Sequence, residues 1–410
     1  VFEPIEGKYE NACVFDFSSM YTTVYISFNI SPETYVGSLK EVKENTEQKK
    51  EEFGFEKVGN LIKIENDFET SCFLPHHVKT GILPKLQKEL LDKRNEIKAQ
   101  RDQYDSDSID YQMLDEFQGV FKRILNTIYG VTSYAKFILF NQYVSSSITA
   151  AARSMLEYSS EIADEYDYKT IYGDTDSIFI QVDGEDLDEV VENAYEFEEV
   201  LNDSWDDFMS RFTDAVPPED ILNIELEFEK SYSRLMMTDV KKRYFGFKNF
   251  YNGKKIDDPK ISVTGFETRR DDTPNYFKEV LLDSYRLFLE DNYKEKLQKK
   301  YQEVKDNIRD VSVEDLVIKK SLGKDMEEYS NDPMHIRALK RVDVEKNKGE
   351  AANVVYTDDH EGVTHYHGQG DIRVDYDRYI EKFFKNKMEL IDPEMKHVLE
   401  GQTKIKRWLR

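Results

Sequence analysis

One short segment constrains this chain more than any other, because it predicts a β-hairpin with two acids at its tip. The segment is YGDTDS at residues 172–177, between a stretch containing β-branched residues at 169–171 and an apolar stretch at 178–180. Such flanks around a Gly-Asp pair indicate two antiparallel strands joined by a tight turn. Asp174 and Asp176 then repel each other unless a cation lies between them. Hard carboxylate oxygens favour magnesium or manganese, so the hairpin predicts a divalent metal site.

A third acid from another strand would let carboxylates bridge two metal ions from both sides, as two-metal phosphoryl transfer requires. The segment CVFDFSSMY at residues 13–21 supplies it, because an apolar strand ends at Asp16 and continues into a polar loop. Alone, an Asp-x-Asp turn is usually a solvated turn, and a strand ending in Asp is usually an ordinary buried strand. The two segments together favour a catalytic site.

These segments resemble motifs C and A of family B DNA polymerases, which have the forms YGDTDS and DFxSLYPS in that family. The resemblance implies that Asp16 and Asp176 bridge two Mg²⁺ ions, which Mn²⁺ can replace, while Asp174 supports the site. The implied catalytic residues are Asp16, Asp174 and Asp176, and the implied metal ligands also include Phe17.

The loop after the first acid resembles the family's nucleotide-binding loop, whose backbone N–H groups bind the triphosphate. The corresponding residues are Ser18, Ser19 and Met20. Tyr21 falls where the family has an aromatic ring under the sugar, which leaves no room for a 2′-hydroxyl and so selects deoxynucleotides. Thr22 replaces the family's proline, and we expect this change to loosen one turn.

Two segments between these motifs predict helices that carry cations. From residue 82, apolar side chains recur at roughly helical spacing, and Arg94 and Lys98 lie four residues apart on one face. In residues 118–130, a second helical face carries Lys122, Asn126 and Tyr129. Alone, each would be a basic surface helix. They resemble the RxxxK pair and the KxxxNSxYG motif of the family's fingers, which implies that all five residues contact the incoming nucleotide.

Acidic and basic segments follow the hairpin. Residues 224–229 alternate strictly and predict a strand with acids on one face; Glu227 and Glu229 are auxiliary metal candidates, although exposed acids on an edge strand are the default explanation. No acid occurs between residues 241 and 255, and this window begins with a sequence that resembles the family's primer-gripping KKRY motif. The DNA-binding residues implied by the resemblance are Tyr172, Gly173, Thr175, Lys241, Lys242, Arg243, Tyr244 and Arg337.

The net charge of −25, from 82 acidic and 57 basic residues, would by itself argue against a nucleic-acid partner. The cations are concentrated locally, so we expect the acidic excess to face away from DNA. No long apolar span or signal peptide is found, and two cysteines exclude a disulfide framework or a multi-cysteine metal site. These features favour a cytoplasmic, nucleoid-associated protein without a membrane partner. His360, His365 and His367 favour a solvated loop over a metal cluster.

The C-terminal part predicts long charged amphipathic helices and ends in a distinct tail. Residues 276–291 and 293–311 suit a mostly helical thumb. The tail resembles the peptide that docks on sliding clamps, in which one turn directs apolar side chains into a pocket. The clamp-binding candidates are Gln402, Ile405, Trp408 and Leu409.

The resemblance covers nearly the whole chain, and the chain is most similar to the archaeal branch of the family. It implies an α+β right-hand fold with an antiparallel β-sheet palm, helical-hairpin fingers and a mostly helical thumb. The expected domains are palm at 1–78 and 141–273, fingers at 79–140, thumb at 274–400 and the clamp-binding tail at 401–410. The chain lacks a recognisable N-terminal domain and exonuclease. We therefore expect a polymerase part, either truncated, processed or paired with a separate subunit that carries those domains.

The function implied by the resemblance is template-directed DNA polymerisation from dNTPs on primer-template DNA, in replication or repair. A reverse transcriptase shares the metal chemistry but normally has adjacent aspartates in its motif C, and Tyr21 favours deoxynucleotides. A catalytically silent DNA- and clamp-binding scaffold derived from a polymerase is the alternative. Inactive relatives tend to lose acids first, and all three acids are present here.

Overall fold

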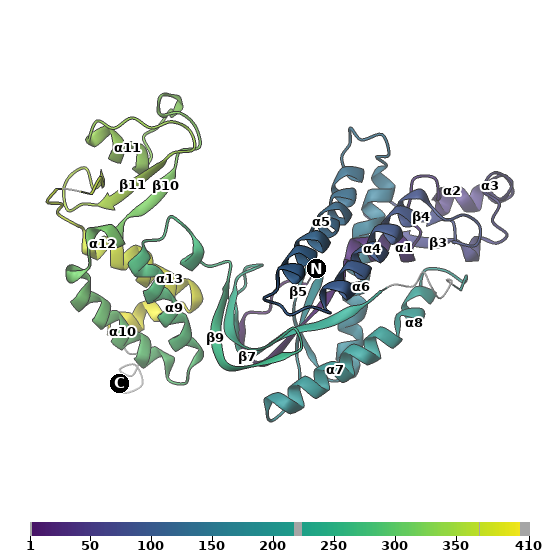
Figure 1. The fold of residues 1–410 in the computed structure, drawn as a ribbon, viewed down its shortest axis with the longest axis horizontal. Helices are drawn as coiled ribbons and strands as arrows, with labels where there is room; N and C mark the ends of the chain where they lie inside the picture. The colour runs from purple at the N-terminus through teal and green to yellow at the C-terminus, as the bar shows by residue number, and fades with distance from the viewer. Residues whose placement is uncertain (1, 217–223, 369, 402–410) are drawn as a thin grey trace, which may run out of the picture. The chain divides into compact units, whose positions relative to one another are not determined.

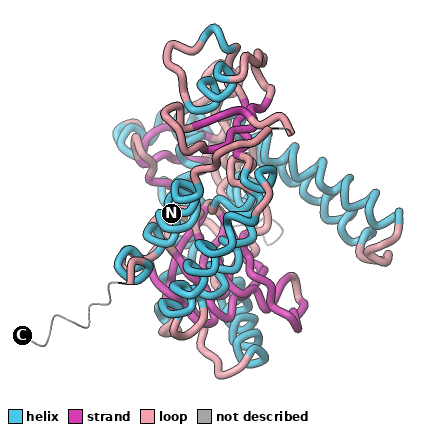
Figure 2. The backbone as a smooth tube through the Cα atoms, turned by 90° about the vertical axis from the view of Figure 1, so that its left-hand side faces the viewer, coloured by secondary structure: helices cyan, strands magenta, loops and turns pink. Residues whose placement is uncertain are grey.

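The computed structural model describes residues 2–216, 224–368 and 370–401, and these divide into two compact units (Figure 1). Unit 1 comprises Val1–Pro4, Asn11–Ser231 and Phe250–Lys255, and unit 2 comprises Ile5–Glu10, Tyr232–Asn249 and Ile256–Arg410. Each unit has its own buried apolar core, and both contain helices and strands (Figure 2). The structure thus confirms a mixed α and β fold with antiparallel sheets.

The main sheet has six strands, and the chain enters it several times. Their order is β5 (Lys169–Asp174), β6 (Ser177–Gln181), β1 (Gly7–Phe17), β7 (Leu226–Met237), β8 (Tyr244–Tyr251) and β9 (Lys254–Thr264). Strand β6 pairs antiparallel with both β5 and β1, and in the second pairing Asp16 lies opposite Ser177. The predicted hairpin is therefore confirmed, and the strand that ends in Asp16 lies directly beside it.

Unit 1 contains the helices α1 (Met20–Ser27), α4 (Ile82–Arg101), α5 (Ile109–Thr132), α6 (Gln142–Glu165), α7 (Leu187–Asp203) and α8 (Trp205–Ser210), besides two short ones described below. Helix α6 buries a face of small and apolar residues, as its sequence predicts, and this face joins the core that includes Phe15 and Phe197. Dense burial of aromatic and aliphatic side chains supplies most of the driving force for folding. The end of β1 is thereby held on a rigid base.

Helices α4 and α5 form a hairpin, and they lie side by side in Figure 1. The Ser108 side chain caps α5 by accepting a hydrogen bond from the backbone N–H of Tyr111. At the same end, Arg101 of α4 forms an ion pair with Asp115 of α5 at 2.7 Å. The two predicted cationic segments are therefore neighbouring helices.

Unit 1 also contains a small sheet that the sequence analysis did not predict. Its strands are β2 (Tyr35–Ser38), β4 (Thr70–Phe73) and β3 (Ile62–Glu65), in that order, and it is accompanied by α2 (Leu39–Glu44), α3 (Thr46–Phe53) and the 3₁₀ turn η1 (Val58–Asn60). Strands of four residues carry little periodic signal, and their pairing is set by packing rather than by local sequence.

Unit 2 is rich in helices, as predicted. These are α9 (Asn275–Leu289), α10 (Tyr293–Asn307), α11 (Met334–Arg341), α12 (Tyr376–Ile380), the π-helical turn η6 (Glu381–Lys385), α13 (Asn386–Ile391) and α14 (Met395–Leu399), with short 3₁₀ turns η2 (Glu267–Arg269), η3 (Ile308–Asp310), η4 (Val313–Leu316) and η5 (Met326–Glu328). It also holds a second unpredicted sheet, which consists of β10 (Ile318–Ser321), β11 (Ala351–Tyr356) and β12 (Val363–His365).

The second small sheet corrects the prediction for one histidine. His365 lies in β12 rather than in a solvated loop, and it is buried with its Nδ1 atom 3.1 Å from the backbone nitrogen of Asn353. In the part of the chain that the structure covers, no three His, Cys, Asp or Glu side chains are grouped so as to hold a metal. Cys13 and Cys72 are both buried and unpaired. Among the described helices, none combines the length and apolar character needed to cross a membrane.

Candidate active site

The turn of the β5–β6 hairpin holds the two acids of YGDTDS in a tight arrangement. Asp174 pairs with Ser177 across the hairpin, so Thr175 and Asp176 form the turn. The backbone N–H of Asp176 donates to the Asp174 carbonyl at 2.6 Å. Thr175 has a φ of 58°, which is rare for a β-branched residue and costs about 1–3 kcal/mol. A strained turn of this kind is typical of a site where the direction of a side chain matters.

The end of β1 is hydrogen-bonded on both sides. The Phe17 N–H donates to the Asp176 carbonyl at 2.8 Å, and the Ser18 N–H donates to the Glu225 carbonyl at 3.1 Å, just before β7. In β7, Phe228 is buried between Glu227 and Glu229, so both acids lie on the opposite face, as predicted, although the strand begins at Leu226. Three separate segments thus contribute one acid each, Asp16, Asp176 and Glu227, to the lining of one hollow, although these side chains do not form a closed three-acid metal cluster.

That place is a hollow of about 380 Å³ within unit 1, and every residue that lines it belongs to a segment or motif singled out in the sequence. The lining residues are Asp16, Phe17, Ser18, Ser19, Met20, Tyr21, Arg94, Lys98, Lys122, Asn126, Tyr129, Thr175, Asp176 and Glu227. The predicted site residues Asp174 and Glu229 lie beside the hollow and do not line it. The structure therefore gathers acids, cations and aromatic rings from β1, α1, α4, α5, β7 and the turn between β5 and β6.

The electrostatics of the hollow fit a bound cation. Burial, followed by the charges of Asp176 and Glu229, raises the pKa of Asp16 to about 7, against smaller opposing effects of Lys122 and Lys230. Lys230 is 2.8 Å from Glu229 and pairs with it. A carboxyl that is buried near two other carboxylates ionises readily only when a positive charge enters, so the donor set suits a divalent metal ion.

The cations differ in how they are held. The Arg94 side chain donates to the Ser19 hydroxyl at 2.8 Å through Nη1 and to the Gln118 amide oxygen at 3.2 Å through Nε. Burial lowers the pKa of Arg94, and nearby Glu227 raises it. Arg94 is therefore anchored to the loop after Asp16, whereas Lys98 and Lys122 reach the hollow from α4 and α5.

The loop after Asp16 leads directly into α1, whose N-terminus faces the hollow. Ser19 adopts a left-handed conformation with φ 60° and begins the helix. The first N–H groups of a helix have no partner within it and favour anions. Tyr21 in the first turn stacks on Tyr129 of α5, with ring centroids 4.3 Å apart and planes 16° apart. The two rings form one wall of the hollow.

Thr22 shows a contact that the sequence did not predict. Its hydroxyl is buried within α1 and donates to the side-chain oxygen of Gln87 in α4 at 3.1 Å. The expectation that this residue loosens a turn is wrong, because α1 continues through it and gains a link to α4. A proline has no hydroxyl, so the presence of threonine in place of the family's proline could have indicated that this position forms a side-chain hydrogen bond.

Two of the predicted DNA-binding residues are not accessible. Tyr172 is fully buried in β5 and packs against Phe179, with ring centroids 5.6 Å apart. Gly173 is buried as well, and a Cβ atom there would lie 2.7 Å from the Phe2 ring. Both residues belong to the core, because strand β5 is covered at these positions. Thr175, which follows in the turn, is exposed.

The KKRY segment lies in unit 2, in and after the turn from β7 to β8. Lys241 and Lys242 are exposed, whereas Tyr244 is buried and lies edge-on to Tyr232. Arg243 lies 3.4 Å from the Glu267 carboxylate, which also accepts a hydrogen bond from Lys387 of α13 at 2.7 Å. The second arginine predicted to bind DNA, Arg337, is exposed on α11.

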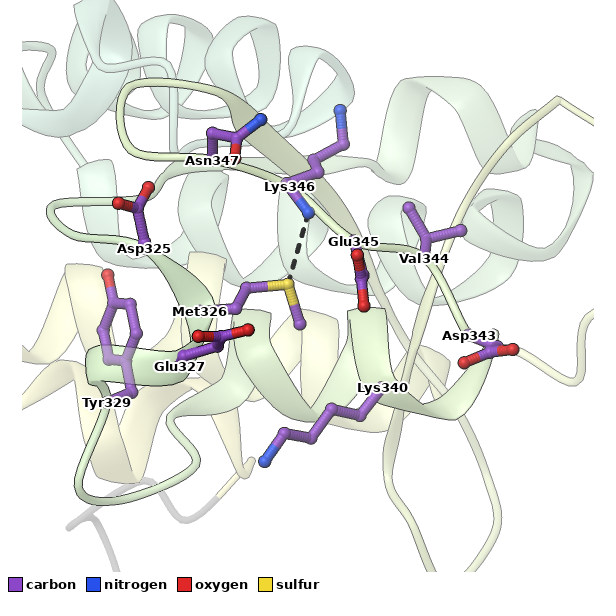
Figure 3. Close-up of a pocket in the computed structure, with 10 residues that line it drawn as sticks. All are labelled: Asp325, Met326, Glu327, Tyr329, Lys340, Asp343, Val344, Glu345, Lys346 and Asn347. Carbon is purple, nitrogen blue, oxygen red and sulfur yellow. Dashed lines mark hydrogen bonds between the residues drawn. The ribbon is translucent and has the colours of Figure 1, made fainter.

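A hollow of about 600 Å³ in unit 2 contains none of the predicted site residues (Figure 3). Several of its polar groups are already bonded: the Lys346 N–H donates to the Met326 sulfur at 3.3 Å, and the Lys340 side chain, which pairs with Asp332, contributes to its wall. The clamp-binding candidates Gln402, Ile405, Trp408 and Leu409 lie outside the described residues, so that prediction stays open.

Comparisons with known proteins find similar DNA polymerases. A DNA polymerase of Archaeoglobus fulgidus is 28% identical over 343 residues, which cover 82% of this chain and 37% of that protein. The DNA polymerase zeta catalytic subunit of Schizosaccharomyces pombe is 32% identical over 291 residues, which cover 67% of this chain and 18% of that protein. The solved structure of the family B DNA polymerase from Pyrobaculum calidifontis matches with a TM-score of 0.66 and 25% identity, over 96% of this chain and 46% of that one.

The chain therefore spans little more than a third of the Archaeoglobus relative, whereas that alignment covers most of the chain itself. A model of the family described as DNA polymerase family B matches residues 1–393. This match, the polymerase relatives and the shared fold confirm the resemblance seen in the sequence. The chain belongs to DNA polymerase family B.

Proposed function

We propose that this chain carries the catalytic site of a template-directed DNA polymerase, which adds deoxynucleotides to a primer 3′-hydroxyl by two-metal phosphoryl transfer in replication or repair. The observation that supports this most is the single hollow that joins Asp16, Asp176, Lys98 and Lys122 with the Tyr21 ring. Such a hollow offers negative charge for metal ions on one side and positive charge for a triphosphate on the other.

Asp16 and Asp176 would hold two Mg²⁺ ions, with Mn²⁺ as a substitute, and the Phe17 backbone would add a ligand. When bound, such ions activate the primer hydroxyl and stabilise the leaving pyrophosphate. Asp174 orients the turn through its carbonyl, which accepts the Asp176 N–H. Glu227 lines the same hollow, and Glu229 acts on Asp16 through its charge, so both are auxiliary candidates.

The triphosphate would bind between the N-terminus of α1 and the cations of the helical hairpin. Ser19, Met20 and Tyr21 present the first N–H groups of α1, whereas the Ser18 N–H is already bonded to Glu225. The Ser18 backbone N–H is therefore not offered to the triphosphate, and Ser18 only forms part of the wall of the hollow. Lys98 and Lys122 neutralise phosphate charge, and Asn126 adds an amide from the same face of α5.

Arg94 would join these cations only after it exchanges partners. It now bonds Ser19 and Gln118. An incoming phosphate offers a bidentate, charged acceptor in place of these two neutral ones, and such bonds are roughly twice as strong. Binding of the nucleotide would therefore release Arg94 from Ser19 and Gln118.

Tyr21 would select the sugar. Its ring is fixed by stacking on Tyr129, so it cannot turn aside without losing an aromatic contact worth about 0.5–1.5 kcal/mol. A fixed ring under the sugar leaves no room for a 2′-hydroxyl. Deoxynucleotides are then preferred because of steric exclusion.

For the rest of the chain, we propose the palm, fingers and thumb boundaries given above. Primer-template DNA would contact Lys241, Lys242 and Arg337, which are exposed in unit 2, and Thr175 in unit 1. Phosphate contacts of this kind give affinity without sequence preference. The tail would bind a sliding clamp.

The test is primer extension on a recessed primer-template with Mg²⁺ and dNTPs, comparing the parent chain with Asp176→Ala. We expect the variant to lose extension by about a thousandfold or more, because a metal ligand is lost, and to keep its affinity for DNA in fluorescence anisotropy. Asp107→Ala, in the exposed loop between α4 and α5, is the control and should extend normally. Equal extension by the parent and Asp176→Ala would refute the assignment.

A second arm tests the sugar pocket in the same assay. Tyr21→Ala should raise incorporation of ribonucleotides relative to deoxynucleotides, whereas Tyr21→Phe keeps the ring and should keep the parent's preference. Ribonucleotide incorporation that is unchanged in Tyr21→Ala would remove Tyr21 from the proposed site.

A further inference from the structure

Helix α5 exposes a row of large apolar side chains on one face. Met113, Phe117, Val120 and Ile124 are 61%, 52%, 39% and 41% exposed. Their spacing of four, three and four residues is that of a helix seam that packs against another helix. Contiguous apolar patches of this kind on a soluble protein usually mark an interaction surface.

This seam is distinct from the two faces of α5 that are already used. Leu125, almost fully buried, packs with Leu91 of α4. Lys122 and Asn126 line the nucleotide hollow. With 100° between successive residues, Val120 lies about 160° around the helix from Lys122 and about 120° from Asn126. A partner on the seam would therefore leave the proposed catalytic face open.

Two shallow hollows flank Val120 along the seam. One, of about 370 Å³, is lined by Met113, Leu114, Glu116, Phe117 and Val120. The other hollow, of about 460 Å³, is lined mainly by residues of α5, including Val120 and Ile124. Leucines of α4 and two apolar residues that follow α5, Phe137 and Leu139, complete its wall. Hollows between ridges are the holes into which the side chains of a packed helix insert.

Opposite charges lie on either side of the centre of the seam, at nearly equal offsets along the helix. Glu116 lies four residues before Val120 and Arg123 lies three residues after it, and both are exposed. Within the described part of the chain, neither side chain forms an ion pair. If a second α5 lay antiparallel with Val120 at the centre, each Glu116 would face an Arg123 across the seam.

We propose that the seam of α5 is the interface between two copies of this chain, which pair antiparallel about a two-fold axis at Val120. Phe117 of one copy then fits beside Ile124 of the second, and Met113 fits beside Thr127, in the larger hollow. The same patch is used on both copies, as a two-fold interface requires.

The self-complementary charges favour a second copy over an unrelated helix. A helix from another protein would need only to match the apolar seam, whereas Glu116 and Arg123 satisfy each other only in the antiparallel pair. This surface is independent of the proposed enzymatic function, because its residues lie outside the nucleotide hollow.

The first experiment is a charge exchange followed by analytical ultracentrifugation, with the chain at about 1–100 µM. The parent should dimerise in this range. Glu116→Arg and Arg123→Glu should each weaken the dimer about tenfold or more, because two attractive pairs become repulsive. The double variant should restore it. A parent that stays monomeric, or a dimer that the double variant fails to restore, would overturn the proposal.

Matched apolar variants test the seam itself. Phe117→Ser should weaken the dimer, whereas Phe68→Ser removes an aromatic ring of similar exposure, 60% against 52%, away from the seam. We expect no effect of the Phe68 change. An equal loss in both variants would mean that general surface stickiness, and not the seam, drives association.

Cysteine cross-linking tests the antiparallel register. Val120→Cys should form a disulfide-linked dimer on mild oxidation, because the two copies meet at this residue. Met113→Cys should not, because the two positions would lie about 20 Å apart. Both native cysteines are 0% exposed and do not compete. Efficient cross-linking through position 113 would indicate parallel pairing and contradict the proposal.

Discussion

The raised pKa of Asp16 makes the stability of the metal-free protein depend on pH. Burial and the charges of Asp176 and Glu229 raise this pKa from 3.8 to about 7, so the folded state disfavours the ionised carboxylate. The contribution of Asp16 to the free energy of unfolding should therefore be most favourable below pH 4, where Asp16 is protonated in both states. This contribution should decrease between about pH 4 and pH 7, where the unfolded chain has lost the proton and the folded protein still holds it, and should level off above pH 7.

The size of the effect follows from the shift. About three pKa units at about 1.4 kcal/mol each set an upper limit near 4 kcal/mol, and partial exposure of the side chain reduces this to about 2–3 kcal/mol. Asp16→Asn removes the charge, so it should stabilise the metal-free protein at pH 8. At about 2–4 °C per kcal/mol for a unit of this size, the gain in Tm is about 5–10 °C. At pH 5, the gain in Tm from Asp16→Asn should be less than about half of the gain at pH 8.

The assay is thermal unfolding of EDTA-treated protein at pH 5 and pH 8, repeated with added Mg²⁺. Mg²⁺ should raise the Tm of the parent at pH 8 and raise that of Asp16→Asn much less, because the variant lacks the carboxylate that a cation neutralises. Asp107→Asn, an exposed acid elsewhere, serves as the control. A gain from Asp16→Asn that is equal at both pH values would refute the reasoning.

Two further substitutions test contacts within single units. Thr22→Val should lower the free energy of unfolding by about 1–2 kcal/mol, because the Gln87 side chain loses its buried partner; Thr22→Ser should not, and urea unfolding will distinguish them. Gly265→Ala should cost about 1–3 kcal/mol and weaken DNA binding, because Gly265 has a φ of +73° and a Cβ atom there would overlap the carbonyl oxygen of Lys242. Thermal unfolding and fluorescence anisotropy measure both effects, and unchanged values would show that the turn can adjust.

The elements that the sequence predicted well are those with a strong local signal. Helix α5 repeats its apolar residues over many turns, and the β5–β6 hairpin is bounded by apolar strands, so periodicity suffices. The residues of the hollow could be predicted from the sequence because separate motifs carry acids suited to metal ions and cations suited to a triphosphate, and phosphoryl transfer requires both in one site. Their meeting in space depends on the pairing of β1 with β6, which no local pattern encodes.

The failures share one physical cause, which is that burial is decided by distant parts of the chain. Tyr172 lies beside the acids in sequence but is covered by the fold, so its ring packs against Phe179 instead of facing solvent. His365 lies in the three-residue strand β12, which is too short to carry a periodic pattern and is held by its pairing with β11. Thr22 gained a partner from α4, more than sixty positions away in the chain.

The shared carboxylate of Glu267 has a practical consequence for anyone who shortens this protein. Its second oxygen is buried and has no other partner in the described structure, and Lys387 supplies one of its two cations. In a version that ends before α13, Arg243 would be the only one of these two cations left beside the Glu267 carboxylate. The turn that holds Lys241 and Lys242 would then lose its link through Glu267 to Lys387. Domain boundaries chosen for expression or crystallisation should therefore include the last described helices.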